Sequence, residues 1–231
     1  MTSEHISVDD LLLAHAAGRL PEPVGLVVAT HIALAPERQS AYREYEAIGG
    51  AMLQDLRPAA LSAGAFDRLV ARLDDEGDAI RVPTGSSARA GIARAENVRE
   101  GGAVDASIPA PLRDYIGGPI DELPWKHYGA VSEASLSLDE AAYRTRLIVL
   151  KAGRSVPKHT HDGQEITVVL KGAFNDGIGR YGRGDISIAD AHVDHQPVAE
   201  ASQDCLCLTV TDAPLRLTGT FSRFLNPFLR F

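Results

Sequence analysis

Two histidines and a glutamate lie at even spacing in the segment PKHTHDGQE, and another histidine follows thirty residues after the glutamate in DHQPVA. These residues are His159, His161, Glu165 and His195. Successive side chains of a β-strand point to opposite faces, so positions separated by even steps can point in one direction. The pattern predicts β-structure in which segments distant in the sequence meet around a divalent metal ion. The alternative is that these histidines are solvated or belong to the core.

Three imidazoles and one carboxylate are a ligand set that suits zinc, and the same set suits iron, manganese, nickel or copper. His192 competes with His195 for the fourth position. The two histidines are three residues apart, so they would lie on opposite faces of an extended segment. The donor types predict one divalent metal ion, most simply zinc, and do not choose further among the metals.

The sequence around these residues alternates short strand-like runs with turn signals. Runs of β-branched and apolar residues span 142–153, 165–174, 184–190 and 204–212, and segments rich in Asn, Asp and Gly separate several of them. Short strands at this spacing are typical of an antiparallel sandwich or a small barrel. Such a fold would enclose the four metal-ligand candidates.

The first part of the chain has a helical pattern instead. Helices are predicted over 8–18, capped by Ser7, and over 25–34, 36–56 and 58–73. The stretch that follows is rich in Gly, Ser, Ala and charge, with little apolar periodicity, as expected for a linker. We therefore predict a helical domain over 1–75, a linker over 76–111 and a metal-binding β-domain over 112–231.

Charge and composition exclude several classes of protein. The chain of 231 residues has a formal net charge of −8, which argues against direct binding to nucleic acid and permits a basic protein partner. No apolar run approaches the length of a membrane span, and the first residues lack the pattern of a signal peptide. These features predict a cytoplasmic protein without a membrane anchor.

The segment GQEITVVLKGAFNDGIGRYGRGD resembles the cupin-like domain of ChrR-type anti-sigma factors, and SVDDLLLAHAAGRL, GLVVATHIAL and AIGGAML resemble their helical domain. The resemblance implies an α+β chain of two domains, an N-terminal helical bundle and a C-terminal cupin-like antiparallel β-barrel. It also implies one metal inside the barrel. His195 is preferred as the last ligand, because its spacing from Glu165 and the following Pro197 match the family.

The resemblance also implies a function. In this family the helical domain sequesters an alternative sigma factor of the extracytoplasmic-function class, and the cupin-like domain permits release under singlet oxygen or related oxidative stress. The expected partner is a sigma factor rather than nucleic acid or a membrane, and a homodimer through the barrel is compatible with the fold. The alternatives are a cupin metalloenzyme, such as a dioxygenase, and a small-molecule sensor, because cupin barrels carry many chemistries.

The N-terminal zinc site of the family is degenerate here. His5 and His31 are present, but Ala35 and Arg38 occupy the positions of the family's two cysteines. Two histidines do not complete a tetrahedral structural site. We therefore expect no tightly bound zinc in the helical domain.

Cys205 and Cys207 are the two cysteines of the chain, two residues apart in a strand-like run. They would face the same side of the strand, near the upper limit of disulfide geometry. They are either small apolar core residues or, as the family's cysteine pair implies, candidates for a redox role.

Overall fold

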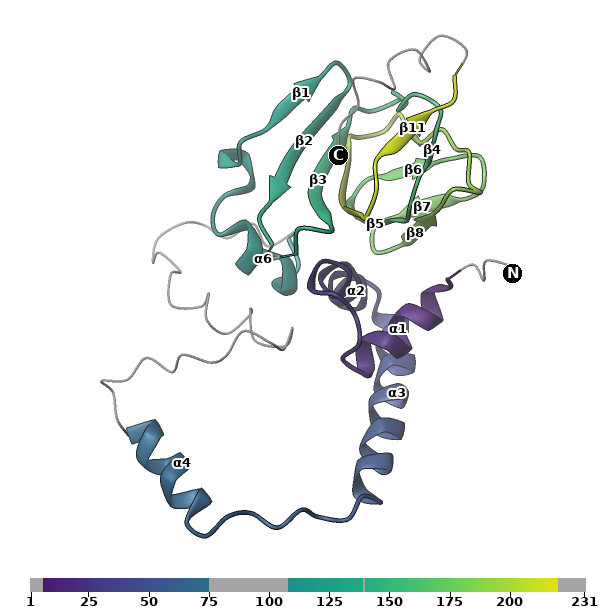
Figure 1. Cartoon of the computed structure of the whole chain (residues 1–231). Helices are drawn as coiled ribbons and strands as arrows, with labels where there is room; N and C mark the ends of the chain where they lie inside the picture. The colour runs from purple at the N-terminus through teal and green to yellow at the C-terminus, as the bar shows by residue number, and fades with distance from the viewer. Residues whose placement is uncertain (1–5, 75–107, 139, 220–231) are drawn as a thin grey trace.

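The computed structural model describes residues 6–74, 108–138 and 140–219. The helices in these ranges precede the strands along the chain (Figure 1). They are α1 (Val8–Ala16), α2 (Glu22–Leu34), α3 (Pro36–Gln54), α4 (Ala65–Asp74), α6 (Ala110–Ile116) and the 3-10 helix η2 (Ile120–Glu122).

Local chemistry fixes the ends of the first helices. At the start of α1, the Ser7 hydroxyl accepts a hydrogen bond from the Asp10 backbone N–H, and the Asp10 carboxylate accepts one from the Ser7 N–H. This reciprocal pair satisfies two backbone donors that the first turn leaves free. In α2 and α3 a proline occupies the first turn, where its missing N–H costs no helical hydrogen bond. The predicted cap at Ser7 is therefore confirmed.

The second half of the described chain forms three β-sheets. The largest has six antiparallel strands in the order β1-β2-β3-β10-β5-β8, beside a three-stranded sheet β7-β6-β9 and a pair β11-β4. The strands are β1 (Lys126–Tyr128), β2 (Val131–Leu136), β3 (Arg144–Leu150), β4 (His159–His161), β5 (Glu165–Lys171), β6 (Ala173–Asn175), β7 (Arg180–Gly182), β8 (Ile186–Ala189), β9 (Val198–Ala199), β10 (Cys205–Thr211) and β11 (Leu215–Leu217).

This arrangement is a cupin-like β-sandwich preceded by helices, and it corrects the predicted barrel. The described strands do not close on themselves, because the six-stranded sheet ends on β1 at one edge and β8 at the other. Alternation of side chains along a strand is the same in a sandwich and in a barrel. The strand pattern in the sequence therefore predicts the strands without predicting closure.

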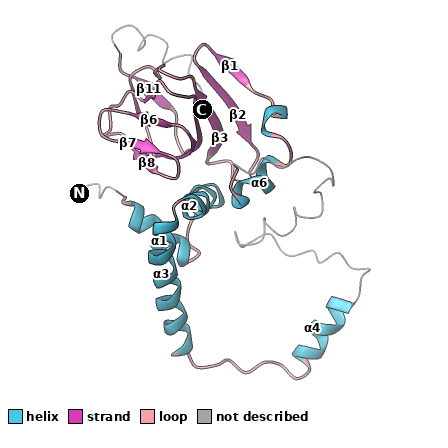
Figure 2. Ribbon diagram, turned by 180° about the vertical axis from the view of Figure 1, so that it is seen from behind, coloured by secondary structure: helices cyan, strands magenta, loops and turns pink. Residues whose placement is uncertain are grey.

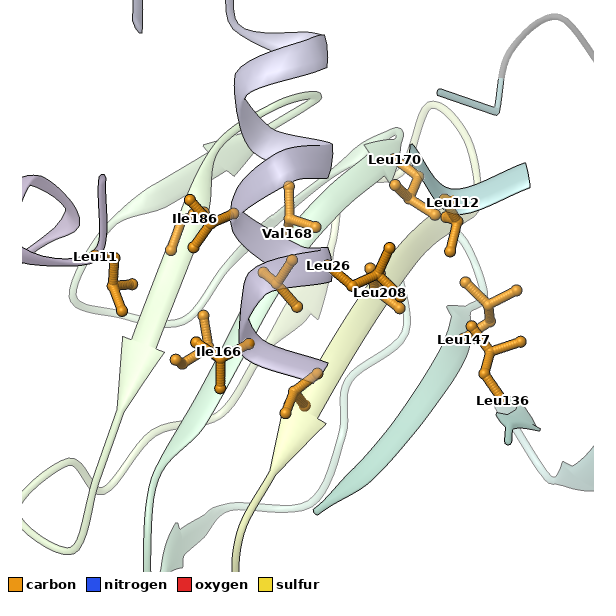
Figure 3. Packing of buried hydrophobic residues seen from close by; sticks show 14 of the residues in the cluster. Leu11, Leu26, Leu112, Leu136, Leu147, Ile166, Val168, Leu170, Ile186 and Leu208 are labelled. Atoms are coloured by element: carbon orange, nitrogen blue, oxygen red, sulfur yellow. The ribbon is translucent and has the colours of Figure 1, made fainter. Parts of the chain in front are cut away.

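The largest core joins α1 and α2 to the six-stranded sheet. Leu12 of α1 and Val27 and Val28 of α2 are fully buried in one apolar cluster with residues of β5 and β10. Figure 3 shows Leu26 of α2 pointing toward the sheet beside Leu208 of β10. Since α2 is apolar on most of its surface, it is stable only when other elements cover it. The helix and the sheet therefore share one core.

The end of α2 is also fixed to the sandwich by polar contacts. His31 is buried, and its Nδ1 lies 2.6 Å from the carbonyl oxygen of Gly184 in the turn before β8. Gly184 has φ of +91°, and a Cβ there would lie 3.1 Å from the Leu34 carbonyl oxygen. A larger residue at this position would be strained and would also crowd the helix end.

The predicted N-terminal helical bundle is not confirmed by the described helices. While α1 and α2 cover the sheet, α3 projects away from it and α4 stands apart from both (Figures 1 and 2). The predicted boundaries at 75/76 and 111/112 stay predictions, and most of the expected linker lies outside the described residues. No helix in the described ranges has both the length and the apolar character needed to cross a membrane.

The helices α3 and α4, with the segment between them, leave many large apolar side chains in contact with solvent. α3 has no buried residue. Eight large apolar side chains of α3, α4 and the segment between them are between 37% and 82% exposed. We call them the α3–α4 apolar surface, and they are Ile48, Met52, Leu53, Leu56, Leu61, Phe66, Leu69 and Val70. In α4, Phe66, Leu69 and Val70 recur at helical spacing, so they lie on one face. The described chain does not cover this face.

Candidate metal centre

The short strand β4 presents two of the four metal-ligand candidates on one face. His159 and His161 are both buried, with the partly buried Thr160 between them. Their side chains point the same way because positions i and i+2 of a strand share a face. β4 pairs in antiparallel register with β11, with His161 opposite Leu215 and His159 opposite Leu217.

His195 reaches the same place through a backbone bridge. The His159 N–H donates to the His195 carbonyl oxygen at 3.0 Å, and the His195 N–H donates to the His159 carbonyl oxygen at 2.9 Å. This reciprocal pair holds the two residues opposite each other, and the His195 side chain is buried. His192 is exposed, and its backbone N–H bonds the Asp190 carboxylate. The structure therefore brings His195 to β4 and leaves His192 outside.

Glu165 begins β5 immediately after the turn that follows β4. The Asp212 carboxylate holds this turn by accepting a hydrogen bond from the Gln164 N–H at 2.6 Å. A Cβ at Gly163 would lie 2.1 Å from the same carboxylate, so only glycine allows this close approach. The tight turn brings the Glu165 carboxylate to 3.9 Å from His161 Nε2.

The four side chains converge within a small volume. Each offers one ligand atom, and these atoms all lie within 4.8 Å of one another. Nε2 of His195 is 3.2 Å from Nε2 of His161 and 3.2 Å from Nε2 of His159. The positions predicted from the sequence, His159, His161, Glu165 and His195, are thus brought together.

Hydrogen bonds on the outer ring nitrogens fix which nitrogens carry protons. His159 Nδ1 lies 2.7 Å from the Pro157 carbonyl oxygen, which only accepts, so this Nδ1 donates and Nε2 keeps its lone pair. His195 Nδ1 lies 3.4 Å from the Asp176 carboxylate and donates in the same way. Two lone pairs therefore face each other at 3.2 Å, a repulsive contact that a cation between them relieves.

Burial keeps His159 and His161 neutral near pH 7. It is the largest cause that lowers the pKa of His159, and burial together with the neighbouring His195 lowers the pKa of His161 to about 4. Neutral imidazole is the form that binds a metal. The donor set, its convergence and the facing lone pairs all fit a divalent metal ion.

The two cysteines lie in β10 and are not among this set of donors. Both are buried, with their sulfur atoms 3.6 Å apart, and they belong to a second apolar cluster with Val169 and Phe174. The hydrogen bond between them lowers the pKa of Cys205 and raises that of Cys207, to which burial also contributes. They are free thiols packed in a core, and a disulfide between them would require a two-electron oxidant.

Of the degenerate N-terminal zinc pair, His5 lies outside the described residues. His31 uses Nδ1 at Gly184, and its buried Nε2 has no hydrogen-bond partner among the described residues. Ala35 is buried at the start of α3, and Arg38 forms a 3.5 Å ion pair with Asp9. In the described part of the chain, His31 therefore connects the helix to the sandwich.

One residue of the site was not expected from the sequence. The segment Asn175-Asp176-Gly177 predicts a turn, and the structure has a turn there between β6 and β7. Nothing in the spacing of Asp176 indicates that its carboxylate also contacts His195. The only signal is that an Asp in a turn has one carboxylate oxygen left after capping the turn.

Comparisons with known proteins place the chain beside anti-sigma factors. A family model described as the ChrR Cupin-like domain matches residues 116–214. The anti-sigma-E factor ChrR of Cereibacter sphaeroides is 39% identical over 231 residues, covering 100% of both chains. A chain in the crystal structure of Rhodobacter sphaeroides SigE in complex with the anti-sigma ChrR matches with a TM-score of 0.71 and 37% identity, covering 90% of this chain and 97% of that chain.

An enzyme with a cupin fold is much more distant. The acetylacetone dioxygenase of Acinetobacter johnsonii is 14% identical, with a TM-score of 0.37, over 42% of this chain and 72% of that chain. A similarity at this level carries no argument about function.

Proposed function

Because the chain belongs to the family of ChrR-type anti-sigma factors, we propose that it binds an extracytoplasmic-function sigma factor and keeps it from RNA polymerase. It is a regulatory protein and not an enzyme. The partner is a protein. This agrees with the net charge of −8, because a protein that binds nucleic acid normally has a basic surface. A sigma factor acts in the cytoplasm, so this is where we expect the chain to work.

The observation that carries the proposal is the α3–α4 apolar surface. Large apolar side chains such as Phe66 and Leu69 are 72% and 54% exposed, although they recur on one face of α4. Exposed apolar faces of this kind mark sites of protein association. The core of the chain needs neither residue, because α1 and α2 already cover the sheet. We assign this surface to the sigma factor.

The sandwich supplies the regulatory half of the proposal. His159, His161, Glu165 and His195 bind one divalent metal ion, for which zinc is the simplest match to the donor set. An ion held by these four side chains would connect β4, β5 and the segment before β9. Any change in the metal site is transmitted to β5, which packs against α2 in the shared core.

The response to oxidative stress, including singlet oxygen, then depends on two groups in the sandwich. One is the metal centre, and the other is the thiol pair Cys205 and Cys207. Oxidation at either group shifts the population toward a conformation that no longer holds the sigma factor. The 3.6 Å separation of the sulfur atoms supports the thiol pair as a redox element, because only a modest movement is needed for a bond.

A reporter assay tests the proposal with the full chain. A promoter that depends on a cognate extracytoplasmic-function sigma factor drives the reporter, and the chain is co-expressed as wild type, as Phe66→Asp/Leu69→Asp, or as Ile178→Asp. Ile178 is the matched control, since it is 66% exposed but lies in the β6–β7 turn. Wild type and control should repress, and the double variant should not. Full repression by the double variant at equal protein level contradicts the proposal.

A further inference from the structure

Asp176 lies in the β6–β7 turn, and each of its carboxylate oxygens has a different task. Oδ1 accepts hydrogen bonds from the backbone N–H groups of Ile178 and Gly179, each at 2.9 Å. Oδ2 faces the other way and lies 3.4 Å from His195 Nδ1. The side chains of Asp176 and His195 are 1% and 2% exposed. The turn therefore fixes the carboxylate, and the carboxylate meets the imidazole away from solvent.

The three imidazoles of the site differ in what holds their outer nitrogen. His159 Nδ1 donates to a backbone carbonyl at Pro157, and His161 Nδ1 has no hydrogen-bond partner among the described residues. His195 alone among the three contacts a carboxylate through Nδ1. A carboxylate that accepts from one ring nitrogen directs the lone pair of the other nitrogen toward the metal and makes it more basic.

We propose that Asp176 is a positioning residue for the metal site: it holds His195 in the tautomer that carries its proton on Nδ1 and presents Nε2 to the ion. This inference rests on the metal site proposed above. Asp176 lies nineteen positions before His195, the ligand it orients. Its Oδ1 bonds only the backbone of its own turn among the described residues.

The charges of the site agree with this role. Glu165 contributes one carboxylate to the donor set. Asp176 adds a second, buried carboxylate, which contacts the donor set through His195. A buried carboxylate is costly unless a positive charge lies near it. Two carboxylates and three neutral imidazoles balance the charge of a divalent cation, and this balance disfavours a monovalent one.

Asp176→Asn tests the role without removing the turn. The asparagine oxygen retains both hydrogen bonds to the turn, and its NH2 group then faces His195 Nδ1. Since NH2 only donates, Nδ1 must accept, and the ring proton moves to Nε2, where it opposes the metal. Asp185→Asn is the matched control, because the Asp185 carboxylate caps a neighbouring turn at the Gly182 N–H, at 2.8 Å, without contact to the three histidines.

The measurement is Zn2+ affinity of the full chain by competition with a chromophoric chelator. We expect Asp176→Asn to bind Zn2+ about 10- to 100-fold more weakly than wild type, and Asp185→Asn to bind within about twofold. Equal affinity of wild type and Asp176→Asn overturns the role of Asp176. An equal loss in both variants also overturns it, because the loss would then follow from the turns. Failure of the wild type to bind Zn2+ overturns the metal site itself.

A second measurement does not depend on metal affinity. In metal-free wild-type protein, ¹⁵N chemical shifts of the His195 ring report which nitrogen carries the proton. We expect the proton on Nδ1 in wild type, and on Nε2 in Asp176→Asn. A wild-type His195 protonated on Nε2 contradicts the proposal even if the metal affinities differ.

Discussion

Truncation of Leu26 tests whether the helices and the sheet are one folding unit. Leu26 is 4% exposed and lies in the core cluster between α2 and the sheet. Leu26→Ala removes buried apolar atoms and leaves a cavity, at a cost of about 3 kcal/mol in the free energy of unfolding, within a usual range of roughly 2–5 kcal/mol. For a chain of this size that corresponds to a fall in Tm of roughly 6–12 °C.

Trp125 makes the assay specific to the sandwich. It is the one tryptophan of the chain, lies just before β1 and packs against the same cluster as Leu26. Urea unfolding followed by Trp125 fluorescence and by far-UV circular dichroism should shift together to lower urea. Leu53→Ala, at a site 68% exposed, should leave both midpoints unchanged. If Leu26→Ala moves only the dichroism and not the fluorescence, the helices and the sheet do not share a core.

Further predictions concern the metal and the thiols. His161→Ala should reduce the metal content of the purified chain from about one ion to near zero by elemental analysis, and equal content would remove His161 from the ligands. The wild-type content should be about one ion rather than two, because Ala35 and Arg38 offer no zinc ligand; a content of two would contradict this. Since the folded pKa of His161 is lowered from 6.5 to about 4, the unfolded chain binds the proton first. Metal-stripped protein should therefore be fully stable above pH 6.5 and lose stability, by roughly 3 kcal/mol, as the pH falls toward 4; a flat dependence of Tm on pH would refute this. Cys205→Ser should leave repression intact without oxidant and weaken release with oxidant, because only the metal centre would then respond; normal release would exclude Cys205.

Local signals in the sequence predict much of the secondary structure. The cap at Ser7 and the proline in the first turn at Pro36 are where the structure has them, because both depend on neighbouring residues only. The second helix begins earlier than expected, at Glu22, since a proline is also tolerated in the first turn there. The fourth begins later, at Ala65, after Gly64 with φ of +67°.

Long-range features of the fold do not follow from such signals. That α2 packs on the sheet as well as against neighbouring helices depends on which apolar faces meet in three dimensions. The same holds for the open sandwich, since β1 and β8 become edges only through the order of strands in the sheet. Short elements such as α6, β4 and β11 have too few residues for a period to be visible.

Some residues of the candidate site can likewise be predicted from local sequence signals, and others cannot. Even spacing brings His159 and His161 to one face of β4, so the sequence predicts that pair directly. The choice of His195 over His192 required the resemblance to the family. His195 reaches β4 through a backbone bridge to His159, and no local pattern predicts that bridge. The contact of Asp176 with His195 joins the β6–β7 turn to a residue of the bridge beside β4, and no local pattern predicts it.

Direct binding of a sigma factor to the full chain tests the central claim most directly. Titration calorimetry should give tight binding for the wild type and for Ile178→Asp, and a dissociation constant at least about 100-fold higher for Phe66→Asp/Leu69→Asp, since buried apolar anchors of an interface each contribute about 2 kcal/mol or more. Binding by the double variant with wild-type affinity would contradict the assignment of the α3–α4 apolar surface to the sigma factor.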